Sequence, residues 1–238
     1  MTEVYIALVR HGEYHQLDSA PSALQPFPLS VAGEQQAHAC ANILLTLAKA
    51  LGVNIAPVIH CSVLLRAWQT ARILCGELNR RAVKPAKFTL VETEQLVERS
   101  VGPLANLASN EIERIVANDP RHQNLPLNWK SDSGFCLPYA GAESLMQAGE
   151  RVAAYITSVV ERDSHIAPVG PPLLHVVIGH GAAMRHAAHH LGVLAFERIA
   201  QLSMHHASPV IIKYCEGGAW EHVDGNWKER SLNQGFAD

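Results

Sequence analysis

Long hydrophobic runs are missing from this sequence, and so is any excess of basic residues. None of its apolar stretches approaches the roughly 20 consecutive apolar residues that a helix needs to span a bilayer. Asp and Glu (22) outnumber Lys and Arg (19), and the formal net charge is −3, so there is no basic stripe of the kind that binds nucleic acid. We therefore expect a protein that neither spans a membrane nor binds nucleic acid.

Paired cysteines and a secretion signal are absent as well. The five cysteines are an odd number without paired spacing, which favours reduced thiols over a disulfide framework. Residues 1–3 lead straight into an apolar run and lack the basic start, apolar stretch and small-residue cleavage site of a signal peptide. Together these features predict a cytoplasmic protein.

The sequence does contain a regular alternation of strand-length apolar runs and helical patterns. With 238 residues and 48% hydrophobic content, the chain can bury a substantial core. The alternation predicts an α/β fold: a three-layer α/β/α sandwich with a mainly parallel central sheet, in one domain over residues 1–238. The expected strands are Val4–Val9, Val58–Cys61, Phe88–Val91, Leu173–Ile178 and Val210–Tyr214.

Two helices are indicated by their ends and their periodicity. Ser30 suits the N-cap of a helix that reaches Leu51 and packs on the sheet, with Gly52 as its stop. A second helix is expected over residues 142–162, where apolar side chains recur at helical spacing opposite charged ones.

Two segments fit neither a helix nor a strand pattern. Residues 118–141 are punctuated by proline, glycine and aspartate and lack periodicity, which predicts an ordered loop with a functional role. The tail at 217–238 contains Trp220, Trp227 and Phe236, which are too many large apolar side chains for a linker. We expect this tail to close a sheet edge or to form a contact in a homo-oligomer.

Residues able to do chemistry follow three of the expected strands. Arg10–Gly12 comes directly after the first strand, Gly179–Gly181 after the fourth, and Arg66 shortly after the second. Open α/β sheets bind ligands at the carboxyl ends of their strands. Two strand-end histidines with two arginines therefore predict one shared phosphate pocket.

A phosphate monoester carries close to two negative charges, so its site needs several fixed donors. The planar forks of Arg10 and Arg66 can each contact two phosphate oxygens, and His180 would be a third donor. The backbone N–H groups that begin the helix after Gly181, that of Ala182 included, would add the partial positive charge of a helix terminus.

His11 lies between Arg10 and Gly12 at the floor of this expected pocket, a position that suits a nucleophile. Neighbouring arginines favour the neutral, nucleophilic imidazole. Attack on phosphorus would give a phosphohistidine, and an acid that protonates the leaving alkoxide could later deprotonate the incoming water. Gly12, like Gly181, would let the backbone approach the ligand closely.

The order of these motifs resembles that of the histidine phosphatase superfamily, also called the phosphoglycerate mutase-like family. Two more segments carry the resemblance: Leu29-Ser30-x-x-Gly33-x-x-Gln36-Ala37, and Leu96–Leu104, which is similar to the family's acid segment. The resemblance extends from residue 4 to about residue 192. It implies a phosphoglycerate mutase-like fold in which residues 118–141 cover the substrate.

The resemblance also implies roles for single residues. Glu98 stands in a Glu-Arg-x-x-Gly pattern and becomes the acid for the leaving group, whereas nothing else in the sequence selects it over Glu92 or Glu94. Arg99 is either a substrate contact or half of a structural ion pair. Tyr14 is expected to line the leaving-group side of the site.

Several positions depart from the mutase pattern within the family. Ser109 replaces a lysine, Ala182-Ala183 replaces Asn-Ser, residues 113–118 lack an Arg-Arg pair, and residues 14–17 lack the usual Ser-x-Trp-Asn. With positive groups at only one end of the ligand, a bisphosphorylated intermediate would be poorly retained. A phosphatase is therefore favoured, with a mutase as the alternative and a catalytically silent phospho-ligand-binding module as the third hypothesis.

A small phosphorylated molecule is the favoured substrate, with a phosphoprotein as the alternative. The fourteen histidines also raise the question of a metal site, above all at His186, His189 and His190 and at the pair His205-His206. Adjacent histidines do not readily share one ion, and His186 and His190, one helical turn apart, have no marked third ligand. Since the arginines can stabilise the phosphoryl charge, we expect no metal and no cofactor.

Overall fold

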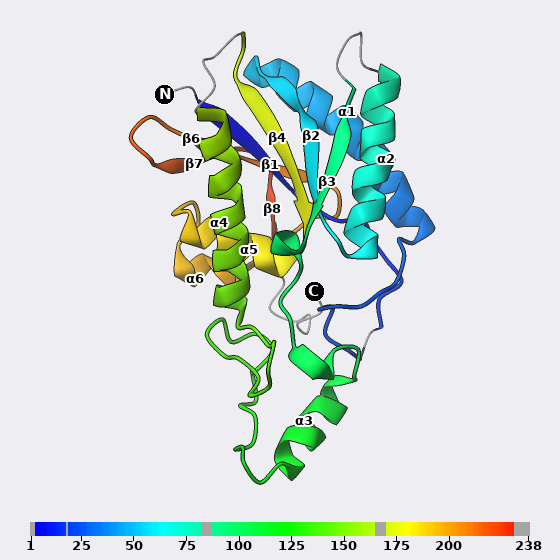
Figure 1. The fold of residues 1–238 in the computed structure, drawn as a ribbon, viewed down its shortest axis with the longest axis vertical. Helices are drawn as coiled ribbons and strands as arrows, with labels where there is room; N and C mark the ends of the chain where they lie inside the picture. Colours follow the sequence, from blue (N-terminus) through cyan, green and yellow to red (C-terminus); the bar gives the residue numbers. More distant parts are fainter. Residues whose placement is uncertain (1–2, 18, 82–86, 165–169, 231–238) are drawn as a thin grey trace.

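The computed structural model describes residues 3–17, 19–81, 87–164 and 170–230, and a six-stranded sheet forms its centre (Figure 1). The strand order is β3-β2-β4-β1-β6-β7. The first four strands are parallel, β6 is antiparallel to β1, and β7 is antiparallel to β6. The sheet strands are β1 (Val4–Arg10), β2 (Asn54–Ser62), β3 (Thr89–Thr93), β4 (Leu173–Gly179), β6 (Pro209–Tyr214) and β7 (Trp220–Asp224). The prediction of a mainly parallel α/β sheet is confirmed.

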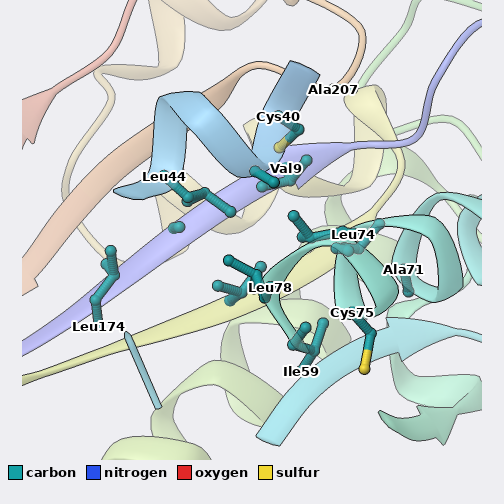
Figure 2. Packing of buried hydrophobic residues seen from close by; sticks show 14 of the residues in the cluster. Val9, Cys40, Leu44, Ile59, Ala71, Leu74, Cys75, Leu78, Leu174 and Ala207 are labelled. Atoms are coloured by element: carbon teal, nitrogen blue, oxygen red, sulfur yellow. The ribbon is translucent and has the colours of Figure 1, made fainter. Parts of the chain in front are cut away.

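Helices cover both faces of the sheet, as the alternation along β1 requires. Tyr5, Ala7 and Val9 point to one face, and the intervening Ile6 and Leu8 point to the other. The first face packs against α1 (Val31–Leu51) and α2 (Leu65–Arg81), as Figure 2 shows for Leu44, Leu74 and Leu78. The second face packs against α4 (Leu145–Ser164) and α5 (Gly181–His190). These layers form the predicted three-layer sandwich.

Local capping sets the first residues of α1 and α4. Ser30 Oγ accepts a hydrogen bond from the Gly33 N–H (3.1 Å), and α1 ends before Gly52, whose φ of 67° is left-handed. The expected helix over 142–162 instead begins at Leu145, because Ser144 and Gln147 form a reciprocal capping box. The N-cap of α1 was thus predicted correctly and the start of α4 was set three residues too early.

The second strand is longer than predicted. β2 begins at Asn54 rather than Val58, and its pairing with β4 shifts register between Ile55 and Ile59. Pro57, which has no N–H to donate, lies within this irregular stretch. The proline interrupts the ladder without ending the strand.

Residues 119–144 form a loop with its own small core. No helix or strand lies between the end of α3 (Ser109–Asn118) and the start of α4. Trp129 is nevertheless buried and packs with Ile112 and Val116 of α3, and its Nε1–H donates to Glu113 (3.0 Å). Together α3 and the loop project from one end of the sheet (Figure 1). The loop is therefore ordered, and its role as a lid stays a prediction.

The described part of the tail extends the structure in two places. β7 is an edge strand of the six-stranded sheet, where Trp220 packs against Tyr214 with ring centroids 5.1 Å apart. β8 (Trp227–Glu229) pairs with β5 (Leu202–Met204) in a separate two-stranded sheet. The expected sheet edge is thus occupied by the tail, whereas Phe236 lies outside the described residues. The remaining short elements are the 3₁₀ turns Glu94–Leu96 and Gly102–Leu104 and the helix α6 (Phe196–Ile199).

All five cysteines are free, and three of them are buried. Across the described ranges, no helix has the length and apolar character that crossing a bilayer demands.

Gly33 holds α1 against the loop that follows β1, so its replacement is expected to destabilise the fold. A Cβ at Gly33 would overlap the carbonyl oxygen of Glu13, which is rigid backbone. Gly33→Ala should therefore lower the free energy of unfolding by about 1–3 kcal/mol. Gly76, which is exposed within α2 with no atom near its Cβ position, is the matched control. Gly76→Ala should raise the free energy of unfolding by up to about 1 kcal/mol. Urea unfolding of both variants tests this difference, and equal stability would contradict the packing described.

Candidate functional site

The candidate site lies at the carboxyl ends of β1, β4 and β2, which are neighbours in the sheet. Arg10 pairs with Gly179 in the parallel β1–β4 ladder, so His11 and His180 follow at the same level. Their ring centroids are 5.1 Å apart. Ser62, the last residue of β2, places its Oγ 2.9 Å from Nε2 of His180. The strand order thus brings together three segments that are far apart in the sequence.

Both ring nitrogens of His11 have defined neighbours. Nδ1 is 2.7 Å from the Gly12 carbonyl oxygen, which can only accept a hydrogen bond. Nε2 accepts a hydrogen bond from Nε of Arg66 (3.2 Å). These contacts assign the proton to Nδ1 and the lone pair to Nε2. Burial, followed by the charges of Arg66, His180 and Arg10, lowers the pKa of His11 well below 6.5, so the ring is neutral at pH 7.

Tyr14 supports the nucleophile and the arginine together. Its ring meets His11 edge-on with centroids 5.2 Å apart, and the Arg66 Cζ lies 4.7 Å from the Tyr14 ring centroid. Tyr14 is buried, and its hydroxyl donates to Gln25 Oε1 (3.4 Å). The structure thus places Tyr14 against His11 and Arg66, and its expected place on the leaving-group side stays a prediction.

Arg66 is fully buried, and its terminal nitrogens are used differently from the expectation. One terminal nitrogen donates to the Gln25 carbonyl (2.8 Å), and the other to the carbonyls of Ser22 (3.2 Å) and Ala23 (2.9 Å). The guanidinium nitrogens that were expected to contact two phosphate oxygens therefore donate to backbone carbonyls in this structure. The cause is the path of the 20–25 segment, which returns to the end of β1 and supplies the acceptors.

Arg10 and the two site glycines are also engaged with protein groups. Arg10 donates from one terminal nitrogen to the Met204 carbonyl (3.1 Å). A Cβ at Gly181 would lie 3.2 Å from Cδ of Arg10, and one at Gly12 would lie 2.5 Å from the Gly33 carbonyl oxygen. Gly181 therefore lets the backbone approach Arg10, and Gly12 lets it approach α1. Sequence analysis had expected both glycines to let the backbone approach the ligand.

His180 is almost completely buried beneath the site. Burial, followed by the charges of Arg66 and Arg10, lowers its pKa well below 6.5, which leaves a neutral ring with one N–H to donate. Nε2 of His180 forms a hydrogen bond with the Ser62 hydroxyl, and no partner for Nδ1 of His180 is found among the described residues.

Glu98 lies at the first turn of α5. Its carboxylate accepts hydrogen bonds from the backbone N–H groups of Arg99 (2.9 Å), Ala183 (3.1 Å) and Ala182 (3.3 Å). The Ala182 N–H, expected to face phosphate, thus donates to Glu98, because an anionic side chain is favourable at a helix N-terminus. Glu98 is buried, whereas Glu92 and Glu94 are exposed.

A cavity of about 120 Å³ adjoins Glu98. It is lined by residues from seven parts of the chain: Gln16, Ala20–Ala23, Glu98, Arg99, Lys130, Ser131, Ser133, Leu145, Ala182, Arg185, His186, Ile199, Ala200 and Arg230. Four of these residues are basic, namely Arg99, Lys130, Arg185 and Arg230, and none of them stands at a mutase position. The expectation that only one end of the ligand has positive partners stays a prediction.

The mutase positions themselves lie elsewhere. Ser109 Oγ donates to the Ser19 carbonyl (3.1 Å) and ties the start of α3 to the 19–25 segment. Near the start of α4, Glu143 forms an ion pair with Arg151 (2.8 Å).

Two residues contact the site that sequence analysis did not assign to it: Thr70, and His206, which was considered only as a metal ligand. His206 places Nδ1 2.9 Å from the His11 carbonyl oxygen, and burial lowers the pKa of His206 to about 4. Thr70 Oγ1 accepts a hydrogen bond from the Gly12 N–H (3.0 Å) and donates to the Arg66 carbonyl (2.7 Å). The position of Thr70 one helical turn after Arg66 was the available signal, whereas His206 is contributed by a distant loop and had none.

The histidines considered for a metal are each engaged with other groups. His186 contacts the Ala182 carbonyl through Nδ1 and Ser133 through Nε2, His189 contacts the Leu194 carbonyl, and His190 contacts that of Met146. Within the described ranges, no group of three or more His, Cys, Asp or Glu side chains is arranged to hold a metal ion.

The same architecture occurs in solved structures of phosphatases. A mycobacterial glucosyl-3-phosphoglycerate phosphatase is similar with a TM-score of 0.66 and 20% identity, covering 96% of this chain and 100% of that one. A putative alpha-ribazole-5'-P phosphatase from Escherichia coli is similar with a TM-score of 0.67 and 19% identity, covering 96% and 98%. The alpha-ribazole phosphatase from Shigella flexneri has a TM-score of 0.65 and 18% identity, with 97% and 96% covered. These similarities establish the fold.

Among curated protein sequences, none matches this chain. Residues 6–228, in contrast, match the sequence model of the histidine phosphatase superfamily (branch 1), a range that includes the site residues predicted from the sequence, from Arg10 to Ala182. On this match, the protein belongs to the histidine phosphatase superfamily.

Proposed function

We propose that this protein is a phosphatase that hydrolyses a phosphate monoester through a phosphohistidine on His11. The observation that carries the proposal is the orientation of His11. Its Nδ1 is held by the Gly12 carbonyl, and its Nε2 lone pair faces Arg66 (3.2 Å) at the ends of three parallel strands. A buried, neutral imidazole with a fixed tautomer meets the requirement for attack on phosphorus.

The chemistry proceeds in two half-reactions. Nε2 of His11 forms a bond to phosphorus while the bond from phosphorus to the ester oxygen breaks, and Glu98 gives its proton to that oxygen. Water then attacks the phosphohistidine, its proton passes to Glu98, and the bond from nitrogen to phosphorus breaks to release inorganic phosphate. Glu98 accepts three backbone hydrogen bonds as a carboxylate in this structure, so it must take up a proton as the ester binds, and it is ionised between the two half-reactions.

Arg10, Arg66 and His180 supply the positive charge and donors for the phosphoryl group in this proposal. Their roles require no metal ion. The terminal nitrogens of Arg66 donate to the 22–25 carbonyls, and its Nε–H donates to Nε2 of His11. That Nε–H must therefore leave the His11 lone pair and turn to the phosphoryl group when Nε2 attacks. A mutase is the second candidate, and the basic cavity beside Glu98 is the observation that favours it.

Phosphate release separates the two candidates. With small phosphate esters, the protein should release inorganic phosphate at the same rate in the presence and absence of EDTA. With bisphosphoglycerate-primed 3-phosphoglycerate, isomer exchange should be slower than phosphate release. Both products are measured in one time course by ³¹P NMR. Exchange that outpaces release would identify a mutase, and activity that EDTA removes and a divalent ion restores would contradict the metal-free mechanism.

A further inference from the structure

We propose that His206 is a positioning residue for the nucleophile: its imidazole holds the peptide between His11 and Gly12 and so keeps the His11 ring aimed for attack. This inference rests on the proposed phosphohistidine mechanism and adds one residue to it. His206 itself forms and breaks no covalent bond in the reaction.

His206 contacts the main chain of His11 through a hydrogen-bond donor. Its Nδ1 lies 2.9 Å from the His11 carbonyl oxygen, which can only accept, so Nδ1 carries the proton. Burial, followed by the charge of Arg10, lowers the pKa of His206 to about 4, and the neutral ring leaves Nε2 without a proton. Protonation at lower pH would add a proton to Nε2 and keep the one on Nδ1. The hydrogen bond to His11 is therefore available on both sides of that pKa.

The sheet brings His206 to this place. His206 and Ala207 lie in the loop between β5 and β6, and β6 pairs with β1, the strand that ends at Arg10. The Ala207 N–H donates to the Arg10 carbonyl (2.8 Å), and Ala207 takes a left-handed φ of 47°. A residue other than glycine is strained in this region, and such strain is typical of functional sites. Two successive carbonyls, those of Arg10 and His11, thus accept hydrogen bonds from one strained loop.

The peptide between His11 and Gly12 is held at both ends. Its carbonyl accepts from His206, and its N–H donates to Oγ1 of Thr70 on α2 (3.0 Å). Gly12 has no side chain to restrict its backbone, and a Cβ there would lie 2.5 Å from the Gly33 carbonyl oxygen. The two hydrogen bonds therefore supply the restraint that a side chain cannot.

This restraint reaches the reacting nitrogen through the Gly12 carbonyl. Nδ1 of His11 hydrogen-bonds to that carbonyl (2.7 Å), which directly follows the held peptide. A fixed Gly12 carbonyl fixes the tautomer and the rotation of the His11 ring, and Nε2 keeps its lone pair. Without His206 the peptide has one anchor fewer, so the ring populates other orientations and Nε2 is less often aligned with phosphorus.

A direct contact between His206 and the substrate is the competing role. The ring centroids of His206 and His11 are 5.6 Å apart, so the second imidazole is close to the nucleophile. The two roles use different nitrogens of His206: positioning needs the Nδ1–H, whereas a substrate contact needs Nε2. Asparagine can replace the first and not the second, because its amide nitrogen, like Nδ1 of histidine, is bonded to Cγ.

Three variants test the proposal. His206→Asn keeps a donor, His206→Leu has the same branched shape without one, and His205→Leu changes the exposed neighbouring histidine as the control. In rapid-quench experiments with labelled ester, His206→Leu should form the phosphohistidine about 10- to 100-fold more slowly. His206→Asn should stay within about threefold of the natural protein, and His205→Leu should match it. The inhibition constant of inorganic phosphate should change less than about threefold in every variant, since positioning acts on attack rather than on binding.

A measurement without substrate reads the same role. Long-range ¹H–¹⁵N NMR of the His11 ring should show the Nδ1–H tautomer alone in the natural protein and in His206→Asn, and a mixture of tautomers in His206→Leu. Thermal unfolding checks that each variant is folded. His206→Phe, which keeps a ring without a donor, replaces His206→Leu if the leucine variant does not fold.

Three results would overturn the inference. Phosphohistidine formation at the full rate in His206→Leu would show that the hydrogen bond is not needed, and an equally slow His206→Asn would show that the imidazole itself contacts the substrate. A single His11 tautomer in every variant would show that the ring is fixed without His206. If the natural protein hydrolyses no ester, the proposed phosphatase fails, and the NMR spectra then decide the positioning role on their own.

Discussion

Replacement of His11 by alanine is expected to lower kcat/KM for a phosphate monoester by at least about 10⁴-fold. The variant loses the imidazole whose Nε2 lone pair faces Arg66, the nitrogen that the proposal assigns to the attack on phosphorus. Steady-state phosphate release measures the loss. His222→Ala, which removes an exposed histidine on β7, is the control and should retain full activity. Substantial turnover by His11→Ala would refute the assignment.

The pH dependence of the natural protein bears on the same residue. Burial and the Arg66 charge hold the pKa of His11 well below 6.5, so the free protein keeps a neutral nucleophile throughout the range above pH 6.5. As the pH falls, the decrease in kcat/KM that is caused by protonation of His11 should therefore have its midpoint below pH 6.5. A midpoint at or above that pH would mean that the imidazole is not desolvated as described.

Glu98→Gln should lower kcat by about 10²- to 10⁴-fold for alkyl esters, whose alkoxides need a proton, and far less for p-nitrophenyl phosphate. The glutamine cannot donate a proton as an acid. The glutamine side chain keeps one oxygen that can accept from the helix N–H groups, but an amide nitrogen replaces the second oxygen. Thermal unfolding therefore checks that α5 is intact, and vanadate binding checks that the phosphoryl pocket is intact.

Glu94→Gln is the matched control, because Glu94 is an exposed carboxylate in the same segment. It should leave both classes of ester unaffected. Equal losses for good and poor leaving groups in Glu98→Gln would move the acid role to another residue.

The fold was predictable where local chemistry and strand topology agree. The strand-end position of His11 and His180 follows from two apolar runs that each lead into a glycine-flanked histidine, and parallel strands do bring such ends together. Ser30 and Gly52 marked the ends of α1 for the same local reasons. The capping box of Ser144 and Gln147 was equally legible in the sequence and would have corrected the start of α4.

The site was less predictable where it depends on the path of loops. The local sequence does not indicate that the 22–25 carbonyls accept hydrogen bonds from the terminal nitrogens of Arg66. It also does not indicate that the Ala182 N–H donates to Glu98. The cavity is the clearest example: Lys130 and Arg230 are 100 residues apart and meet only through the fold. The family pattern therefore gives no sign that Arg185 and Arg230 line the same cavity.

The most direct test of the central claim is a rapid-quench experiment with a ³²P-labelled phosphate monoester, followed by peptide mapping. The proposed mechanism predicts that label accumulates within the first turnover on His11, bound to Nε2, with the acid lability and base stability of a phosphohistidine. Label on any other residue, or turnover in which no protein-bound label forms at any quench time, would contradict it.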